Sequence, residues 1–262
     1  SQVSAERAVY RAVQDSRAAI RYLRAHAEEL RIDTSLVYFL GSSAGAYTGL
    51  HNVFMNTDEE RPASTLEIDY SFPSMDEGPD LGGYDAIESQ FEHKAQPNAL
   101  IALWGALKSP DLIQPGDDEI PVFLVHGTSD LILPFGVGRP FQSPFLPKTY
   151  GSDPISEKMF ELNYPHKTYF VEDEGHEFYG VTNGNWYGEP NGYWGIVVDQ
   201  TTEFLHQQHK PAAEFIFQVD GKSVQFEDKS TGNIQSWYWD FGDGTTSTQQ
   251  NPTHEYVDTG SV

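Results

Sequence analysis

The sequence predicts an α/β fold with a mostly parallel sheet, followed by a small β domain. Three observations support this prediction. Predominantly apolar runs at residues 36–40, 99–104 and 121–127 have the composition of strands that are buried on both faces of a parallel sheet. Segments with helical periodicity lie between strands, as alternating strands and helices require. After Pro211 the pattern changes to short alternating runs with an Asp-Gly turn, which is typical of an antiparallel β domain.

The length and composition bound the domain organisation and the partners. The 262 residues allow one large α/β domain and a smaller one, which we place at residues 1–210 and 211–262. The 39 acidic and 16 basic side chains give a formal charge of -23, which argues against nucleic acid as a partner because such a surface repels phosphates. The sequence contains no run of about 18 apolar residues, so we predict no transmembrane segment. The absence of cysteine excludes disulfides and thiolate nucleophiles and leaves the redox compartment open.

The remaining elements follow from periodicity. Residues 5–31 repeat apolar and small side chains at helical spacing between Arg and Glu, which predicts a long amphipathic helix. Further helices are expected at residues 44–54, 156–164 and 196–208, and a further strand at 167–171. Residues 56–98 are expected to form an irregular segment with a short helix, and residues 134–150 a loop rich in Pro, Gly and Phe.

The two ends of the sequence indicate a fragment. The chain lacks an initiator Met, and its first residues show neither the basic start nor the apolar core of a signal peptide. We expect strands of the α/β domain to precede Ser1. The last five residues form a turn with no strand after it, so we also expect the β domain to continue beyond Val262.

A Gly-x-Ser-x-Gly motif at residues 41–45 stands between the first predicted strand and a helix. In that context the small residues permit a tight turn that presents Ser43 as a nucleophile. The alternative is a turn rich in Ser and Gly that binds nothing, and the motif alone does not distinguish the two.

A serine nucleophile needs an imidazole to take its proton and a carboxylate to orient that imidazole. The carboxyl ends of parallel strands open on the same edge of a sheet, so residues that follow different strands can converge there. Asp130 follows the strand at 121–127, and His176 follows the strand at 167–171. We therefore predict a catalytic triad of Ser43, Asp130 and His176, with its members in that order along the chain.

Two neighbouring carboxylates are alternatives for the acid. Asp173 and Glu174 lie close to His176 in the sequence and could orient it in place of Asp130. The simpler interpretation of both is that they are solvated charges of the turn.

The other histidines are weaker candidates for the base. His126 stands at a strand end ahead of the turn that carries the acid, and we interpret it as structural. His166 precedes its strand, which places it at the opposite edge of the sheet. His51 and His93 have no carboxylate-bearing turn beside them, so we interpret them as ordinary core or surface residues.

Acyl transfer also requires hydrogen-bond donors for the oxyanion. The backbone N–H of Ala44, at the start of the helix after the nucleophile, can supply one, and we expect the second upstream of Ser1. No cluster with metal-ligand spacing and no phosphate-binding glycine loop occurs, so we predict no metal and no cofactor.

These residues together resemble a carboxylesterase or lipase of the α/β-hydrolase superfamily. The resemblance covers about residues 5–209 and is carried by the Arg-rich helix, the motif at 41–45, the Leu-Trp-Gly at 103–105, and the segments 125–130 and 175–177. It implies ester hydrolysis through an acyl-enzyme formed on Ser43, with Asp130 and His176 as partners. The chain departs from the family in lacking an amino-terminal part with the His-Gly-Gly type of oxyanion loop.

The tail from Ala213 resembles a PKD domain, through the segments 238–244 and 252–256. Such modules resemble immunoglobulin sandwiches and are common in secreted or surface bacterial enzymes that act on polymers. The resemblance therefore implies a secreted or cell-surface location and a polysaccharide or other polymer as a surface partner. The alternative is that the domain is only a spacer.

The leading functional hypothesis is a secreted serine esterase acting on small or polymeric esters. Its loops are rich in aromatic residues, which suit an apolar or aromatic substrate group, and we name Phe135, Phe178, Tyr179 and Trp186 as candidate substrate contacts. The same rings could instead cap the core.

Two other hypotheses remain open from the sequence. A serine peptidase of the same superfamily would use the same triad, because the triad does not distinguish amides from esters. An inert hydrolase domain that serves a binding or scaffold protein is the alternative from a different functional class.

Overall fold

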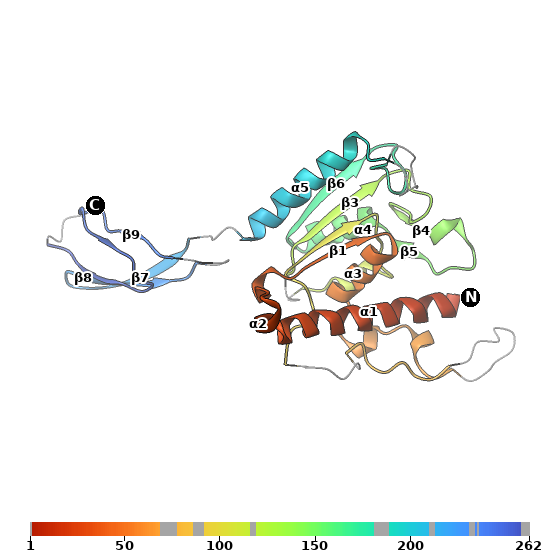
Figure 1. Ribbon diagram of the computed structural model, residues 1–262, viewed down its shortest axis with the longest axis horizontal. Coiled ribbons are helices and arrows are strands. Elements are labelled where there is room, and N and C mark those ends of the chain that lie inside the picture. Colours follow the sequence, from red (N-terminus) through yellow and green to blue (C-terminus); the bar gives the residue numbers. More distant parts are fainter. Residues whose placement is uncertain are drawn as a thin grey trace. The chain divides into compact units, whose positions relative to one another are not determined.

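The computed structural model describes residues 2–68, 78–85, 92–115, 119–180, 189–209, 213–230, 234 and 236–257. The chain divides into two compact units, Ser1–Phe204 and Leu205–Val262 (Figure 1). Each unit is described by itself. No helix within these residues is long and apolar enough to cross a bilayer.

The first unit is built on a four-stranded sheet whose strands are all parallel. Its order is β1 (Tyr38–Ser42), β2 (Ala99–Leu103), β3 (Val122–Gly127) and β6 (His166–Val171). Every residue of β2 and β3 is buried. This explains why β2, and β3 as far as Val125, are continuously apolar in the sequence, since side chains on both faces pack against other elements.

Helices cover both faces of this sheet. Alternate residues of β2 and β3 point to one face, where they pack with α3 (Ala44–Phe54) and α4 (Ser152–Glu161) in the largest core cluster. Phe123 points to the other face and meets Phe204 of α5 (Gly192–His209), with ring centroids 5.6 Å apart.

The long helix α1 (Gln2–Ala25) lies beside α3 (Figure 1). The sequence predicted one helix to residue 31, but the helix ends at Ala25 and a single turn, α2 (Ala27–Leu30), follows. Arg31 closes that turn in the left-handed conformation, which stops further helix. Tyr10 and Val13 of α1 pack with Met55 in a second core cluster.

The buried arginines of α1 bind the irregular segment between α3 and β2. Arg7 donates to the carbonyls of Ser64 and Leu66 at 2.8 and 3.1 Å, and Arg24 donates to the carbonyl of Gln96 at 2.8 Å. Further bonds run from Gln14 to the carbonyls of Leu81 and Gly83, from Arg21 to that of His93, and from Arg17 to the carboxylate of Asp85. Buried charge is tolerated only when it is hydrogen-bonded in this way.

The loop predicted at residues 134–150 contains a short antiparallel pair. Val137 in β4 (Val137–Gly138) pairs with Tyr150 in β5 (Thr149–Tyr150). The remaining short elements of this unit are 3₁₀ turns: η1 (Thr34–Leu36), η2 (Asp58–Glu60), η3 (Ala63–Thr65), η4 (Pro110–Leu112) and η5 (Pro140–Gln142).

The second unit is antiparallel, as its sequence predicts. One sheet has the order β11 (Thr253–Glu255), β8 (Ser223–Asp228) and β7 (Phe215–Asp220), and β9 (Trp239–Asp240) pairs with β10 (Thr246–Ser247). Val224, Phe226 and Phe241 form its core, with Trp239 and Tyr256 packed against them.

His51 of α3 is buried in the first unit as a neutral imidazole. Its Nδ1 lies 2.8 Å from the Tyr47 carbonyl, so it carries the proton, and its Nε2 accepts from the Lys108 N–H at 3.1 Å. Burial is the main cause that lowers the pKa of His51 to about 4.

This pKa predicts acid sensitivity of the fold. Below pH 6.5 the histidine of the unfolded chain takes up a proton that the folded chain does not bind, so stability decreases as the pH falls from about 6.5 to about 4. The difference between the pKa values of the unfolded and folded chain corresponds to a loss of about 3 kcal/mol in the free energy of unfolding. Urea unfolding of the wild type and of His51→Gln at pH 7.5 and 4.5 measures this loss, and we expect a smaller pH-dependent loss of stability in the variant.

His26→Gln is the matched surface control, because His26 contacts the Tyr22 carbonyl in the same way. Equal losses in wild type and His51→Gln would contradict the prediction.

Candidate active site

Ser43 occupies a strained turn between β1 and α3. Its φ of 55° and ψ of -117° form a conformation that residues with a side chain rarely adopt. The Ser43 N–H donates to the Leu103 carbonyl at 3.0 Å, which fixes the turn against β2. A Cβ on Gly41 would lie 2.3 Å from the carbonyl carbon of Gly45, so the turn closes only with glycine at the first position of the motif.

The structure brings together the three residues that the sequence proposes as a triad. The Ser43 Oγ lies 2.9 Å from His176 Nε2, and His176 Nδ1 lies 2.7 Å from Asp130 Oδ2. Both His176 and Asp130 are buried. Each residue follows a different strand of the sheet, at its carboxyl end.

The Asp130 carboxylate accepts hydrogen bonds on both oxygens. Its Oδ1 accepts from the N–H groups of Ile132 and Leu133 at 2.7 and 3.0 Å, and its Oδ2 accepts from two histidines. Burial raises the pKa of Asp130, but hydrogen bonds from His126 and His176 outweigh burial and lower it to about 2. The acid is therefore ionised at any pH at which the protein would work.

His126 is the second histidine on this carboxylate. Its Nε2 lies 3.1 Å from both Asp130 Oδ2 and the Leu133 carbonyl, which makes it a donor, and its Nδ1 lies 2.8 Å from Ser152 Oγ. It is fully buried, and the imidazole that meets Ser43 Oγ is that of His176. The sequence predicted a structural His126 but not its bond to Asp130, although the spacing of four residues across the turn is a usable signal.

Two interlocked turns place Asp130 beside His176. The Ser129 N–H donates to the Glu174 carbonyl at 2.8 Å, and a Cβ on Gly127 would lie 2.4 Å from that oxygen. Glycine at 127 therefore lets the turn after β6 approach the turn after β3. Of the alternative acids, Asp173 donates its N–H to Thr128 Oγ1 at 3.0 Å, while the carboxylate on His176 Nδ1 is that of Asp130.

The other histidines lie away from this constellation. His166 begins β6, at the end of the sheet opposite to the carboxyl ends, and its Nδ1 lies 2.8 Å from the Tyr164 carbonyl. His93 lies in the segment held by Arg21. His51 is a buried residue of α3, two turns after Ser43, and it pairs with the Tyr47 carbonyl and the Lys108 N–H.

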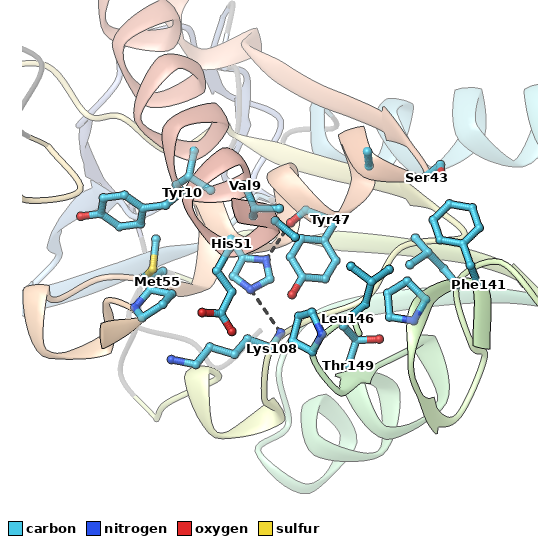
Figure 2. A pocket seen from close by; sticks show the side chains of 18 of the residues that line it. Val9, Tyr10, Ser43, Tyr47, His51, Met55, Lys108, Phe141, Leu146 and Thr149 are labelled. Atoms are coloured by element: carbon cyan, nitrogen blue, oxygen red, sulfur yellow. Dashed lines mark hydrogen bonds between the residues drawn. The ribbon is translucent and has the colours of Figure 1, made fainter. Parts of the chain in front are cut away.

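A cavity of about 300 Å³ opens beside Ser43. Figure 2 shows Ser43 near Phe141 at one end of it and Tyr10 and Met55 at the other. Its walls come from α1, α3 and the loop after β3, and most are apolar. The lining residues are Ala5, Glu6, Val9, Tyr10, Val13, Ser43, Ala44, Tyr47, His51, Met55, Pro62, Lys108, Ile132, Leu133, Pro140, Phe141, Leu146, Pro147 and Thr149.

Of the aromatic residues proposed as substrate contacts, the three that the structure describes, Phe135, Phe178 and Tyr179, do not line this cavity. Phe135 packs edge to face on His126 and Phe170. Phe178 is 1% exposed and packs on Trp104, and Tyr179 stacks on the same indole with centroids 5.2 Å apart. In the structure these rings pack on neighbouring side chains, and their role as substrate contacts stays a prediction. Trp186 lies outside the described residues.

Comparison with known proteins agrees with this architecture. Residues 2–78 match the family model described as BD-FAE, and residues 208–261 match the model of the PKD domain. Esterase 2 of Thermogutta terrifontis, phosphorylated by paraoxon, has the same fold with a TM-score of 0.51 and 20% identity. The alignment covers 76% of this chain and 64% of the esterase. The first unit therefore has the α/β fold of this esterase, and residues 208–261 match the model of the PKD domain. The predicted fold class is thereby confirmed.

The PKD domain connects the chain to larger bacterial proteins. The pre-pro-metalloprotease PrtV of Vibrio cholerae is 46% identical over 71 residues, which are 26% of this chain and 8% of PrtV. Collagenase ColA of Bacillus cereus is 46% identical over 47 residues, which are 16% of this chain and 5% of ColA. The chain thus spans less than a tenth of the length of either relative, and the similarity concerns a module that they share.

Proposed function

We propose that the α/β-hydrolase domain is a serine carboxylic-ester hydrolase that works through an acyl-enzyme. The observation that supports this most is the continuous series of hydrogen bonds from Ser43 through His176 to Asp130. A nucleophile, a base and an acid that orients the base are thereby arranged as acyl transfer requires.

In the acylation step, His176 Nε2 takes the proton from Ser43 Oγ while that oxygen attacks the ester carbonyl carbon. The ionised Asp130 accepts from His176 Nδ1–H, so Nε2 is left free to act as the base. The same carboxylate stabilises the imidazolium that forms. His176 then gives its proton to the departing alkoxide, and the acyl group remains on Ser43.

The oxyanion of the tetrahedral intermediate needs donors that are already in place. Ala44 is the first residue of α3, so its N–H has no acceptor within the helix. The positive end of the helix dipole adds to this N–H. We propose the Ala44 N–H as one oxyanion donor. In the second half of the reaction, His176 activates a water that hydrolyses the acyl-enzyme.

The cavity receives the acyl side of the ester in this mechanism. The leaving oxygen must face His176 Nε2, because that atom protonates it. Ser43 and Ala44 line the cavity, whereas His176 and Asp130 do not. The group that enters the cavity is therefore on the opposite side of the carbonyl from the leaving group.

A fluorophosphonate probe tests the nucleophile directly. We expect covalent labelling of the wild type and none of Ser43→Ala, because the probe reacts with a serine whose hydroxyl is activated by a base. Ser42→Ala is the matched control, since the adjacent Ser42 Oγ accepts from Trp104 Nε1 at 2.8 Å instead. Equal labelling of Ser43→Ala and the wild type would show that the nucleophile lies elsewhere. Parallel assays with ester and amide substrates distinguish an esterase from a serine peptidase.

We further propose that the protein works outside the cell, on polymeric or surface-bound esters, with the PKD domain as its surface-binding module. Support comes from the relatives of that domain, which include a pre-pro-metalloprotease and a collagenase. Retention of the full chain on insoluble polysaccharide or polyester tests surface binding. Recovery of the protein only from the cytosol of its source cells would contradict the location.

A further inference from the structure

The hydroxyl of Tyr47 is a polar group in the otherwise largely apolar cavity. Tyr47 lies one turn after Ser43 on α3, and its N–H donates to the Ser43 carbonyl at 2.9 Å. In Figure 2 its hydroxyl points away from the helix, toward the space between Lys108, Leu146 and Thr149. Within the described part of the chain the phenol oxygen has no hydrogen-bond partner.

The ring that carries this hydroxyl is held in place without a ligand. It stacks on His51 with centroids 4.3 Å apart and an interplanar angle of 22°. His51 is itself fixed by the Tyr47 carbonyl and the Lys108 N–H. Burial raises the pKa of Tyr47, so the phenol stays neutral and keeps its proton. The cavity therefore contains a preorganised neutral donor.

The surroundings do not satisfy this donor. A phenylalanine would fill the same volume, so packing does not require the hydroxyl. Tyr47 is half-buried, so water reaches its hydroxyl in the open cavity, and a ligand that displaces this water must supply an acceptor. Thr149 lines the same cavity, is 1% exposed, and has an Oγ1 with no partner among the described residues. Two hydroxyl groups at this cavity thus lack protein partners.

We propose that Tyr47 determines acyl specificity: its hydroxyl selects acyl groups that are apolar along most of their length and carry one hydrogen-bond acceptor within the cavity. This inference rests on the proposed function, because the cavity is an acyl site only if Ser43 is the nucleophile. The discrimination arises because an acceptor on the substrate pairs with the phenol, whereas a purely apolar chain leaves it buried and unpaired.

Paired substrates that differ by one carbonyl group test the inference. The pairs are p-nitrophenyl hexanoate with 5-oxohexanoate, and heptanoate with 6-oxoheptanoate. We expect the ratio of kcat/KM, oxo ester over plain ester, to fall about three- to tenfold in Tyr47→Phe for at least one pair, as the loss of one hydrogen bond predicts.

Tyr22→Phe is the matched control, because Tyr22 stacks on His26 in the same spacing of four residues but lies at the surface and away from the cavity. We expect Tyr22→Phe to keep the wild-type ratios. Thermal unfolding should show that Tyr47→Phe is folded, because a phenylalanine ring keeps the stacking on His51.

A binding measurement separates this inference from the proposed function. Isothermal titration of the same intact esters into Ser43→Ala and Ser43→Ala/Tyr47→Phe should show a similar three- to tenfold loss of the preference for the oxo ester. Unchanged ratios in Tyr47→Phe, in both hydrolysis and binding, would overturn the role of Tyr47. If the wild type hydrolyses none of the esters, the proposed function fails, and the binding ratio still decides whether Tyr47 recognises the acceptor.

Discussion

Replacement of Asp130 by Asn is expected to lower kcat about 10⁴-fold. Oδ2 of Asp130 accepts from His176 Nδ1 and His126 Nε2, and Oδ1 accepts from two backbone N–H groups. An amide has only one oxygen, so in either orientation its NH₂ group faces donors. Pairing that NH₂ with His176 requires the other tautomer, in which Nε2 carries the proton and cannot take one from Ser43.

Initial rates with p-nitrophenyl butyrate measure this effect, together with thermal unfolding to separate activity from stability. We also expect a lower stability for Asp130→Asn, because buried donors lose their acceptor. Asp173→Asn is the matched control, since Asp173 is the aspartate nearest to His176 in the sequence and His176 Nδ1 pairs with Asp130 instead. A loss in Asp173→Asn as large as in Asp130→Asn would show that the acid is wrongly assigned.

The second large effect is expected from Gly41→Ala. The new Cβ would lie 2.3 to 2.5 Å from the backbone atoms of Gly45 and Ala46, and such contacts require β1 or α3 to shift. We expect a loss of about 4 kcal/mol or more in the free energy of unfolding, which places this change among the severe single substitutions. Activity should be lost as well, because the same turn positions Ser43.

Gly45→Ala provides the control within the same motif. A Cβ at Gly45 has nothing within 4 Å, and alanine is favoured over glycine in a helix by about 1 kcal/mol. Urea unfolding and ester hydrolysis should therefore show that Gly45→Ala is folded and active. Equal behaviour of the two variants would mean that the turn in solution is wider than the structure shows.

In the first unit, the elements that local patterns mark clearly could be predicted from the sequence. The helix at residues 44–54 was predicted with the bounds that α3 has, because a turn of small residues precedes a helical run. β1 was predicted at 36–40 but runs over Tyr38–Ser42. Asp33 accepts from the Ser35 N–H and starts a 3₁₀ turn that delays the strand, and pairing with β2 carries it on to Ser42.

The candidate site was predictable because strand ends converge in a parallel sheet. Ser43, Asp130 and His176 could each be located by the strand before it. The cavity could not be predicted from the sequence, since its walls include the first half of α1 and the loop after β3, which meet only through packing. For the same reason the packing of Phe178 and Tyr179 on Trp104 could not be predicted, because nothing in their aromatic loop indicates which ring they contact.

The arginines of α1 have a consequence for sequence change in the segment that they hold. Arg7 and Arg24 mostly bind backbone carbonyls between residues 64 and 96, and every amino acid carries a carbonyl. Substitutions at the residues that Arg7 and Arg24 hold by their carbonyls therefore leave these bonds intact, whereas an insertion or deletion moves the carbonyls out of register with the helix. Asp85 is the exception, because its side chain pairs with Arg17 and Arg21.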